Sequence, residues 1–164
     1  MEANMLPDLL CEHLKLVVCG TAAGNTSAEL KQYYARPGNK FWATLYQTGL
    51  TPVQLPPAAY ERLLDYGIGL TDLVKNKSGM DRVLTTSDFG SDLLVQKIKQ
   101  YQPRYVCFNG KRAAEVFFQK PVDFGLQPVK IGHTGFFVAP STSGAANGYW
   151  DINHWKELAR LCNP

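Results

Sequence analysis

Short apolar runs that end at glycine, asparagine or proline recur along the chain. Three of them are unbroken, at 16–19, 105–108 and 136–139, and a shorter run covers 69–71. Apolar runs of this length are typical of strands whose two faces are both buried. The sequence therefore predicts strands at these places.

The segments between these runs carry apolar residues at intervals of three or four, the spacing of a helix with one buried face. This spacing predicts helices over 41–46, 91–98, 113–118 and 151–161. Ser91 and Asp151 stand where two of these helices begin, and a side-chain oxygen there can accept a hydrogen bond from the first backbone N–H groups. We expect both residues to act as N-caps.

Strands that alternate with helices predict an α/β fold. We expect a three-layer sandwich, in which a central, mostly parallel sheet of about four or five strands is flanked by helices, with residues 1–164 in one domain. In such sheets, ligands bind beyond the carboxyl ends of the strands. The loops expected there are rich in Gly, Ser, Thr, Asn or Lys, and they are 20–27, 72–77, 109–112 and 140–149.

The composition suits one globular domain, since 45% of the 164 residues are hydrophobic and 19% are charged. A formal charge of +3 and a pI near 8.6 permit a polyanionic partner without requiring one. No apolar run is long enough to span a bilayer, and the first residues lack the layout of a secretion signal. We therefore expect a cytoplasmic protein of the bacterial intracellular type, with no membrane partner.

The cysteines and histidines show no pattern typical of a metal centre. The four cysteines lie far apart without a Cys-x-x-Cys pair, which predicts reduced thiols and no metal, iron–sulfur cluster or other cofactor. The histidines suggest neither a metal cluster nor a Ser-His pair.

Five blocks, taken in order, resemble the uracil-DNA glycosylase superfamily and in particular its mismatch-specific branch. The loop Gly20-Thr21-Ala22-Ala23-Gly24 is similar to that branch's Gly-x-Asn-Pro-Gly, and 33–42 is similar to its aromatic-Ala-His-Pro-x-Asn-x-Phe-Trp segment. Further blocks lie at 64–74, 101–111 and 140–144. The resemblance covers about 16–161 and implies a DNA glycosylase on the fold described above.

Two positions depart from the pattern of the branch. Ala22 stands where the branch carries the Asn that orients the attacking water, and Ser141 stands where it carries a second Asn. Other branches with an apolar residue at the first position are thought to place a polar residue elsewhere in the pocket. A water-positioning residue outside the first loop is therefore expected.

The resemblance assigns Gly20, Thr21 and Ala22 to the catalytic loop, with Ala23 and Gly24 beside the substrate. Backbone N–H groups held in such a loop stabilise the negative charge of the leaving base without rearranging. A glycosylase must also hold a base that has been flipped out of the duplex.

Two side chains are candidates for holding the base, and a third is a candidate for positioning the water. Tyr34 occupies the family's stacking position. Asp72 occupies a position that faces the base edge, where a carboxylate can accept a hydrogen bond from uracil N3–H; the alternative is a turn cap near Lys75. Asn39 is the candidate that positions the water, and its alternative roles are a structural bridge or a helix N-cap.

The loop after the last predicted strand is implied to grip the DNA backbone. Its residues are Ser141, Thr142, Ser143, Gly144 and Ala145. Ala145 is small for the family's wedge position, so gap filling would fall to Ala146, Asn147 or Tyr149. Lys111, at the start of a helix, would bind phosphate or belong to a solvated turn.

We expect a monomeric, monofunctional glycosylase that removes uracil, opposite guanine, from DNA and leaves an abasic site for base excision repair. No lysine lies in a motif that suggests a Schiff base. One alternative is a glycosylase for another deaminated base such as hypoxanthine. The other is a non-catalytic binder of uracil or DNA that has lost the water-positioning Asn.

Overall fold

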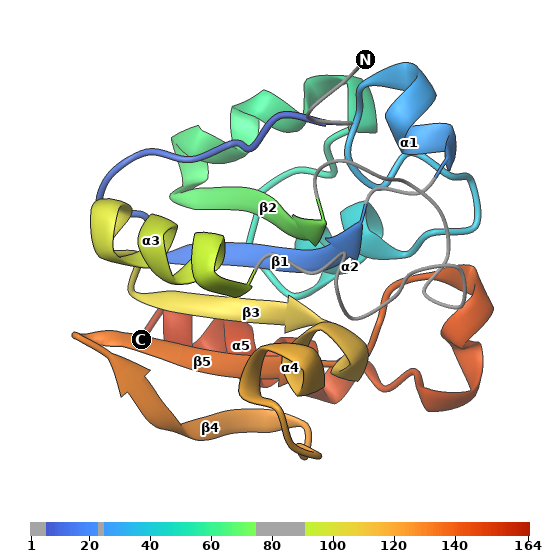
Figure 1. Cartoon of the computed structure of the whole chain (residues 1–164). Helices are drawn as coiled ribbons and strands as arrows, with labels where there is room; N and C mark the ends of the chain where they lie inside the picture. Colours follow the sequence, from blue (N-terminus) through green and yellow to red (C-terminus); the bar gives the residue numbers. More distant parts are fainter. Residues whose placement is uncertain (1–5, 23–24, 75–90) are drawn as a thin grey trace.

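Five strands form one central sheet in the computed structural model, which describes residues 6–22, 25–74 and 91–164 (Figure 1). The strands are β1 (Leu16–Ala22), β2 (Ile68–Val74), β3 (Tyr105–Asn109), β4 (Gly125–Ile131) and β5 (Thr134–Ala139). Their order across the sheet is β2-β1-β3-β5-β4. Neighbouring strands are parallel except β4, which is antiparallel to β5.

The strands predicted from apolar runs are confirmed as β1, β2, β3 and β5. The strand β4 has no matching apolar run, because it is an edge strand and most of its side chains are exposed. It also contains Pro128, which cannot donate a hydrogen bond and is tolerated at sheet edges.

Helices cover both faces of the sheet and complete the predicted three-layer α/β sandwich. In Figure 1, α3 (Ser91–Tyr101) and α4 (Lys111–Phe118) lie in front of the sheet, with α2 (Phe41–Gln47) and α5 (Ile152–Cys162) behind it. The short α1 (Asn25–Leu30) and the 3₁₀ helices η1 (Pro57–Tyr66) and η4 (Gly144–Tyr149) were not predicted as helices. The first and the last of these three are only six residues long, whereas η1 does carry apolar residues at helical spacing, at Tyr60, Leu63 and Leu64.

Two hydrophobic cores lie on opposite faces of the sheet, because successive side chains of a strand point to opposite sides. In β1, Leu16 and Val18 contribute to the core beneath α2 and α5, whereas Val17 and Cys19 contribute to the core beneath α3 and α4. The strands are thus buried on both faces, which explains their unbroken apolar runs.

The two predicted N-caps have different outcomes. The Asp151 carboxylate accepts a hydrogen bond of 2.9 Å from the Asn153 backbone N–H, so Asp151 caps α5 as predicted. Ser91 is instead the first residue of α3, and the residue before it lies outside the described part of the chain.

A segment near the N-terminus covers the outer edge of β2. Leu9 and Leu70 exchange two backbone hydrogen bonds, each of 2.9 Å, as in an antiparallel pair. This contact satisfies backbone groups that would otherwise be left at the sheet edge.

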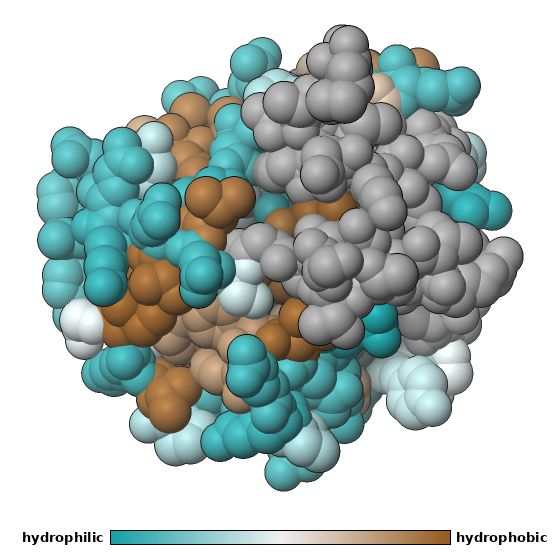
Figure 2. Space-filling view, viewed as in Figure 1, coloured by the Kyte–Doolittle hydropathy of each residue, from teal (hydrophilic) through white to brown (hydrophobic). Residues whose placement is uncertain are grey.

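The face shown in Figure 2 carries hydrophilic side chains interspersed with smaller hydrophobic areas, over the region of α3 and α4 in Figure 1. Leu93 on α3 is one of the exposed apolar side chains. Among the described residues, no helix is both long and apolar enough to cross a membrane.

Candidate functional site

The carboxyl ends of β1, β2, β3 and β5 lie at one edge of the sheet, on the right in Figure 1. Gly20 of β1 is paired with Asp72 of β2 in the parallel register. The strands thus extend further than the apolar runs indicate, and Asp72 lies inside β2, not in the loop expected at 72–77. Its side chain is buried, with 5% exposure. The alternative role as a turn cap near Lys75 involves residues outside the described part of the chain.

Gly20 brings three elements together because it has no side chain. A Cβ atom at this position would lie 2.8 Å from Asp72 Oδ1 and 3.4 Å from the Tyr34 hydroxyl oxygen. The carboxylate and the hydroxyl therefore both lie close to the space that a side chain of residue 20 would occupy. A glycine permits this close approach, and any larger residue would push against the carboxylate.

Tyr34 contributes an aromatic face to this edge. Its ring stacks on the buried Phe41 ring with a centroid separation of 4.0 Å and an interplanar angle of 29°. The residue as a whole is partly exposed. Its backbone has a φ of 52°, in the left-handed region that costs a non-glycine residue about 1 kcal/mol or more.

The Tyr34 hydroxyl is fully shielded from solvent and has no hydrogen-bond partner of ordinary geometry among the described residues. Burial first, and the nearby Asp72 charge second, raise the pKa of Tyr34 well above its usual value. The Asn109 side chain offsets part of this rise, although its contact with the hydroxyl does not meet hydrogen-bond geometry. Tyr34 is therefore a neutral O–H donor at physiological pH.

Asn109, at the end of β3, was not predicted as a site residue. Its amide Nδ2 donates to Thr142 Oγ1 at 3.0 Å, and its Oδ1 accepts from the Thr142 backbone N–H at 3.0 Å. This reciprocal pair fixes the loop after β5 to the central sheet. The sequence signal was the Asn-Gly pair that ends the third apolar run, which indicated a turn but no partner.

Thr142 consequently lies inside the protein, with 0% exposure, and holds the loop in place. The other described residues of the predicted DNA-binding loop are more accessible, because Ser141 and Ser143 are half-buried and Gly144 is exposed. A Cβ at Gly144 would lie 3.1 Å from the Gly38 carbonyl oxygen, so this loop packs closely on the segment before α2.

Asn39 lies in that segment, at the start of α2. Its Oδ1 accepts a hydrogen bond of 2.9 Å from the Phe41 backbone N–H. The next residue, Lys40, donates its backbone N–H to the Thr142 carbonyl oxygen at 2.9 Å. The N-cap residue of α2 is Lys40, so the Asn39 oxygen bonds the first helical N–H from the position before the cap. This is a structural contact, and water positioning by Asn39 stays a prediction.

The remaining predicted site residues are distributed around the same edge. Thr21 and Ala22 are half-buried at the end of β1, and Ala23 and Gly24 lie outside the described residues. The side chain of Ala145 also lies outside the described part. The Lys111 ammonium lies 4.5 Å from the centroid of the Phe124 ring, a cation–π contact that accounts for its position without a phosphate.

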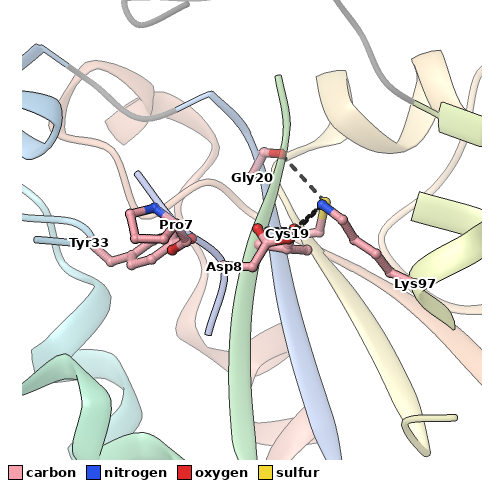
Figure 3. Close-up of polar contacts among 7 residues, drawn as sticks. Pro7, Asp8, Cys19, Gly20, Tyr33 and Lys97 are labelled. Atoms are coloured by element: carbon pink, nitrogen blue, oxygen red, sulfur yellow. Dashed lines mark hydrogen bonds and ion pairs between the residues drawn. The ribbon is translucent and has the colours of Figure 1, made fainter. Parts of the chain in front are cut away.

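A polar cluster on the outer side of β2 holds the N-terminal segment beside the site (Figure 3). The Lys97 ammonium forms an ion pair of 2.6 Å with Asp8, and the Thr71 hydroxyl donates to Asp8 Oδ1 at 2.7 Å. The Tyr33 hydroxyl donates to the Pro7 carbonyl oxygen at 2.9 Å. Figure 3 shows Lys97 pointing toward Asp8 and Gly20. This cluster was not predicted, because its members are far apart in the sequence.

Within the described ranges, no group of three or more His, Cys, Asp and Glu side chains is arranged to hold a metal ion. The described side chains nearest Gly20 supply a buried carboxylate, a neutral tyrosine hydroxyl and an aromatic ring.

The sequence from residue 7 to residue 161 matches the model of the uracil DNA glycosylase superfamily. The chain belongs to this superfamily. Its fold is similar to the solution NMR structure of a candidate uracil DNA glycosylase from Methanosarcina acetivorans, with a TM-score of 0.66 and 21% sequence identity. The similarity covers 97% of each chain.

Proposed function

We propose that this protein is a monofunctional DNA glycosylase that hydrolyses the N-glycosidic bond of uracil, paired with guanine, and leaves an abasic site. The superfamily match across residues 7–161 supports glycosylase activity in general. The observation that carries the proposal is the close approach of both Asp72 and Tyr34 to Gly20 at the carboxyl end of β1. The protein would act on DNA inside the cell, as a monomer.

In this mechanism, the flipped base stacks on one face of Tyr34, while Phe41 supports the opposite face. Backbone N–H groups of the loop that begins at Gly20 stabilise the negative charge that develops on the base as the C1′–N bond breaks. Water then attacks C1′ of the sugar. Asn39 is the proposed group that orients this water, and Asp72 is the proposed acceptor for the base N–H.

A second function is a non-catalytic binder of uracil-containing DNA. The observation that favours it is Ala22 at the end of β1, since an alanine side chain cannot hold a water molecule by hydrogen bonding. A glycosylase for another deaminated base, such as hypoxanthine, is a third candidate, because such bases also carry a ring N–H beside a carbonyl.

A single-turnover assay separates these functions. Duplexes that carry uracil, thymine, hypoxanthine or xanthine opposite a fixed partner are incubated with excess protein and a chelator. We expect abasic sites in the G:U duplex, with no strand cleavage until alkali or heat is applied. Tight binding without release of any base would instead identify a binder, and preferential release of hypoxanthine would identify the third function.

A further inference from the structure

The backbone of Tyr34 has an unusual conformation. Its φ of 52° lies in the left-handed region, where the side chain of an L-residue crowds the following carbonyl oxygen. A bulky residue keeps such a conformation only where its surroundings hold it there. The backbone conformation of a residue also limits the directions that its side chain can take. The groups that hold the backbone of Tyr34 therefore help to place its ring against Phe41.

The two peptide groups that flank the Cα atom of Tyr34 are both held by side chains. In the group before it, the Tyr33 carbonyl oxygen accepts a hydrogen bond of 3.1 Å from Trp42 Nε1. In the group after it, the Ala35 N–H donates to Ser27 Oγ at 2.9 Å. Peptide groups are planar, so φ and ψ of Tyr34 are the rotations that relate these two planes. Contacts with α1 and α2 therefore restrict both rotations.

Tyr33 is held at a further point, the tip of its side chain. The residue is buried, with 2% exposure, and its ring packs edge-on against Tyr60 with the centroids 5.4 Å apart. Its hydroxyl donates to the Pro7 carbonyl oxygen at 2.9 Å (Figure 3). Burial first, and then the charges of Asp72 and Asp8, raise the pKa of Tyr33, so the hydroxyl keeps its proton. Rotation of Tyr33 would break this bond and would turn its peptide carbonyl as well.

The Pro7 carbonyl belongs to the N-terminal segment, residues 6–9. Leu9 of this segment exchanges two backbone hydrogen bonds with Leu70 on the outer side of β2. Pro7, two residues earlier, has no N–H and cannot repeat such an exchange. Its carbonyl oxygen accepts from the Tyr33 hydroxyl. The segment thus links the edge of the sheet to the residue before Tyr34.

Contacts on both sides of Pro7 fix the N-terminal segment. Leu6 is buried in the core on the side of α2 and α5. Asp8 forms its ion pair of 2.6 Å with Lys97 of α3 and accepts a hydrogen bond of 2.7 Å from the Thr71 hydroxyl. The Pro7 carbonyl oxygen is therefore an acceptor in a fixed place, which suits it to orient the group that donates to it.

We propose that Tyr33 is a positioning residue for Tyr34, and that the N-terminal segment acts through it. The bond from the Tyr33 hydroxyl to Pro7 keeps the peptide group before Tyr34 in one orientation, and this keeps the Tyr34 ring where a flipped base would stack. The proposal rests on the proposed function for the identity of the group that stacks there. It extends the site to residues 6–9, which precede the blocks that resemble the superfamily.

Tyr33→Phe tests the proposal, and Thr134→Val is its matched control. The Thr134 hydroxyl is also buried and also donates to a proline carbonyl, that of Pro103, but it lies at the amino end of β5. Each substitution removes one buried hydroxyl and its hydrogen bond while it keeps the shape of the side chain. Both variants should unfold at a lower temperature than the parent protein. Only Tyr33→Phe should affect Tyr34.

Nuclear magnetic resonance measures the position of the ring in the DNA-free protein. The parent should show nuclear Overhauser cross-peaks between the rings of Tyr34 and Phe41, whose centroids are 4.0 Å apart. These cross-peaks should be weaker in Tyr33→Phe, because Tyr34 can then leave the left-handed conformation. They should be unchanged in Thr134→Val. This measurement does not depend on base release.

Binding measures the consequence for the substrate. Dissociation constants are determined by fluorescence anisotropy for a duplex that carries an uncleavable 2′-fluoroarabinouridine opposite guanine. Tyr33→Phe should weaken binding about threefold to tenfold, as for one lost hydrogen bond. In a Tyr34→Ala background, Tyr33→Phe should weaken binding no further, because a positioning residue has no effect without the ring that it positions. Thr134→Val should bind as tightly as the parent.

Weaker cross-peaks, together with a loss of affinity that requires Tyr34, would support the proposal. It is overturned if Tyr33→Phe keeps the parental cross-peaks, if it binds the duplex as tightly as the parent, or if its loss of affinity persists in the Tyr34→Ala background. The supporting results without base release by the parent from any duplex would establish the positioning of Tyr34 and reject the proposed catalytic function.

Discussion

At the residue scale, Asn39 combines a visible structural contact with a proposed chemical task. Its Oδ1 caps the Phe41 N–H, and this leaves its amide N–H groups to orient water. Asn39→Ala should lower the rate of the chemical step by about 10² to 10⁴. It should also reduce the free energy of unfolding by about 1 kcal/mol through the lost cap.

Asn39→Ser separates the two effects, because serine caps helices as well as asparagine but its hydroxyl does not extend as far. Single-turnover cleavage of a G:U duplex and denaturant unfolding would be measured for both variants. Asn39→Ser should keep the parental stability but cleave the duplex slowly. Adding Ala22→Asn to Asn39→Ala should partly restore the cleavage rate. If Asn39→Ser retains the parental rate, Asn39 is only a cap and another group handles the water.

The close approach of the Asp72 carboxylate to Gly20 of β1 gives a prediction about stability. In Gly20→Ala the new Cβ would lie 2.8 Å from Asp72 Oδ1, so the buried carboxylate would have to move. We expect a loss of about 1–3 kcal/mol in the free energy of unfolding, as for other overpacked sites. Chemical denaturation measures this loss.

Gly38→Ala is the matched control for Gly20→Ala. A Cβ at Gly38 would meet nothing within 4 Å, so the change in unfolding free energy should stay within about 0.5 kcal/mol. Equal stability of the two variants would show that Asp72 does not press against Gly20.

At the element scale, the loop and η4 after β5 present one large side chain to solvent. Tyr149 at the end of η4 is 78% exposed, more than the other exposed large hydrophobic side chains of the described residues. The residues between Pro140 and Tyr149 are all small or polar. Among them, only Tyr149 is large enough to fill the gap that a flipped base leaves in the duplex.

Tyr149→Ala should therefore slow uracil release from duplex DNA while leaving release from single-stranded DNA unchanged. A lost base–aromatic stack is worth about 1–3 kcal/mol, which corresponds to roughly 5- to 150-fold. Tyr149→Trp should retain the duplex rate, and Tyr46→Ala on α2, another exposed tyrosine, should change neither rate. A Tyr149→Ala variant with parental rates on both DNA forms would remove Tyr149 from the gap-filling role.

Sequence patterns predicted the elements better than the contacts between them. The runs at 16–19 and 136–139 indicate strands because burial on both faces leaves only apolar residues. The edge strand β4 gives no such signal, since its exposed positions can be polar. Likewise, the short η4 has no buried stripe to produce helical spacing.

The predicted site residues gain their geometry from strand register, which the motifs taken one by one do not reveal. Asp72 faces Gly20 only because β1 and β2 pair in one particular alignment. Asn109 meets Thr142 because β3 and β5 are neighbours in the sheet. Aromatic and glycine motifs could identify Tyr34 and Gly20 individually, but the approach of the hydroxyl and the carboxylate to Gly20 depends on three separate elements.

At the scale of the whole molecule, contacts on both faces of the sheet and along the outer side of β2 hold the site in place. Phe41 stands behind Tyr34 in one core, and the Asp8–Lys97 ion pair ties the N-terminal segment to α3 on the opposite side. The Leu9–Leu70 pair closes the edge of β2. Asp72 is thus carried by a strand with neighbours on all sides, which suits a group that must be held in a fixed position.

The direction of the strands has a practical consequence for handling the protein. The C-terminus lies at the amino end of the sheet (Figure 1), where Asn163 accepts a hydrogen bond of 2.7 Å from Lys15 just before β1. A linker attached after Pro164 would leave the molecule on the side away from Gly20 and Asp72. Protein tethered to a bead or sensor chip by this end would present the proposed DNA-binding end of the sheet outward, ready for repeated exposure to oligonucleotides.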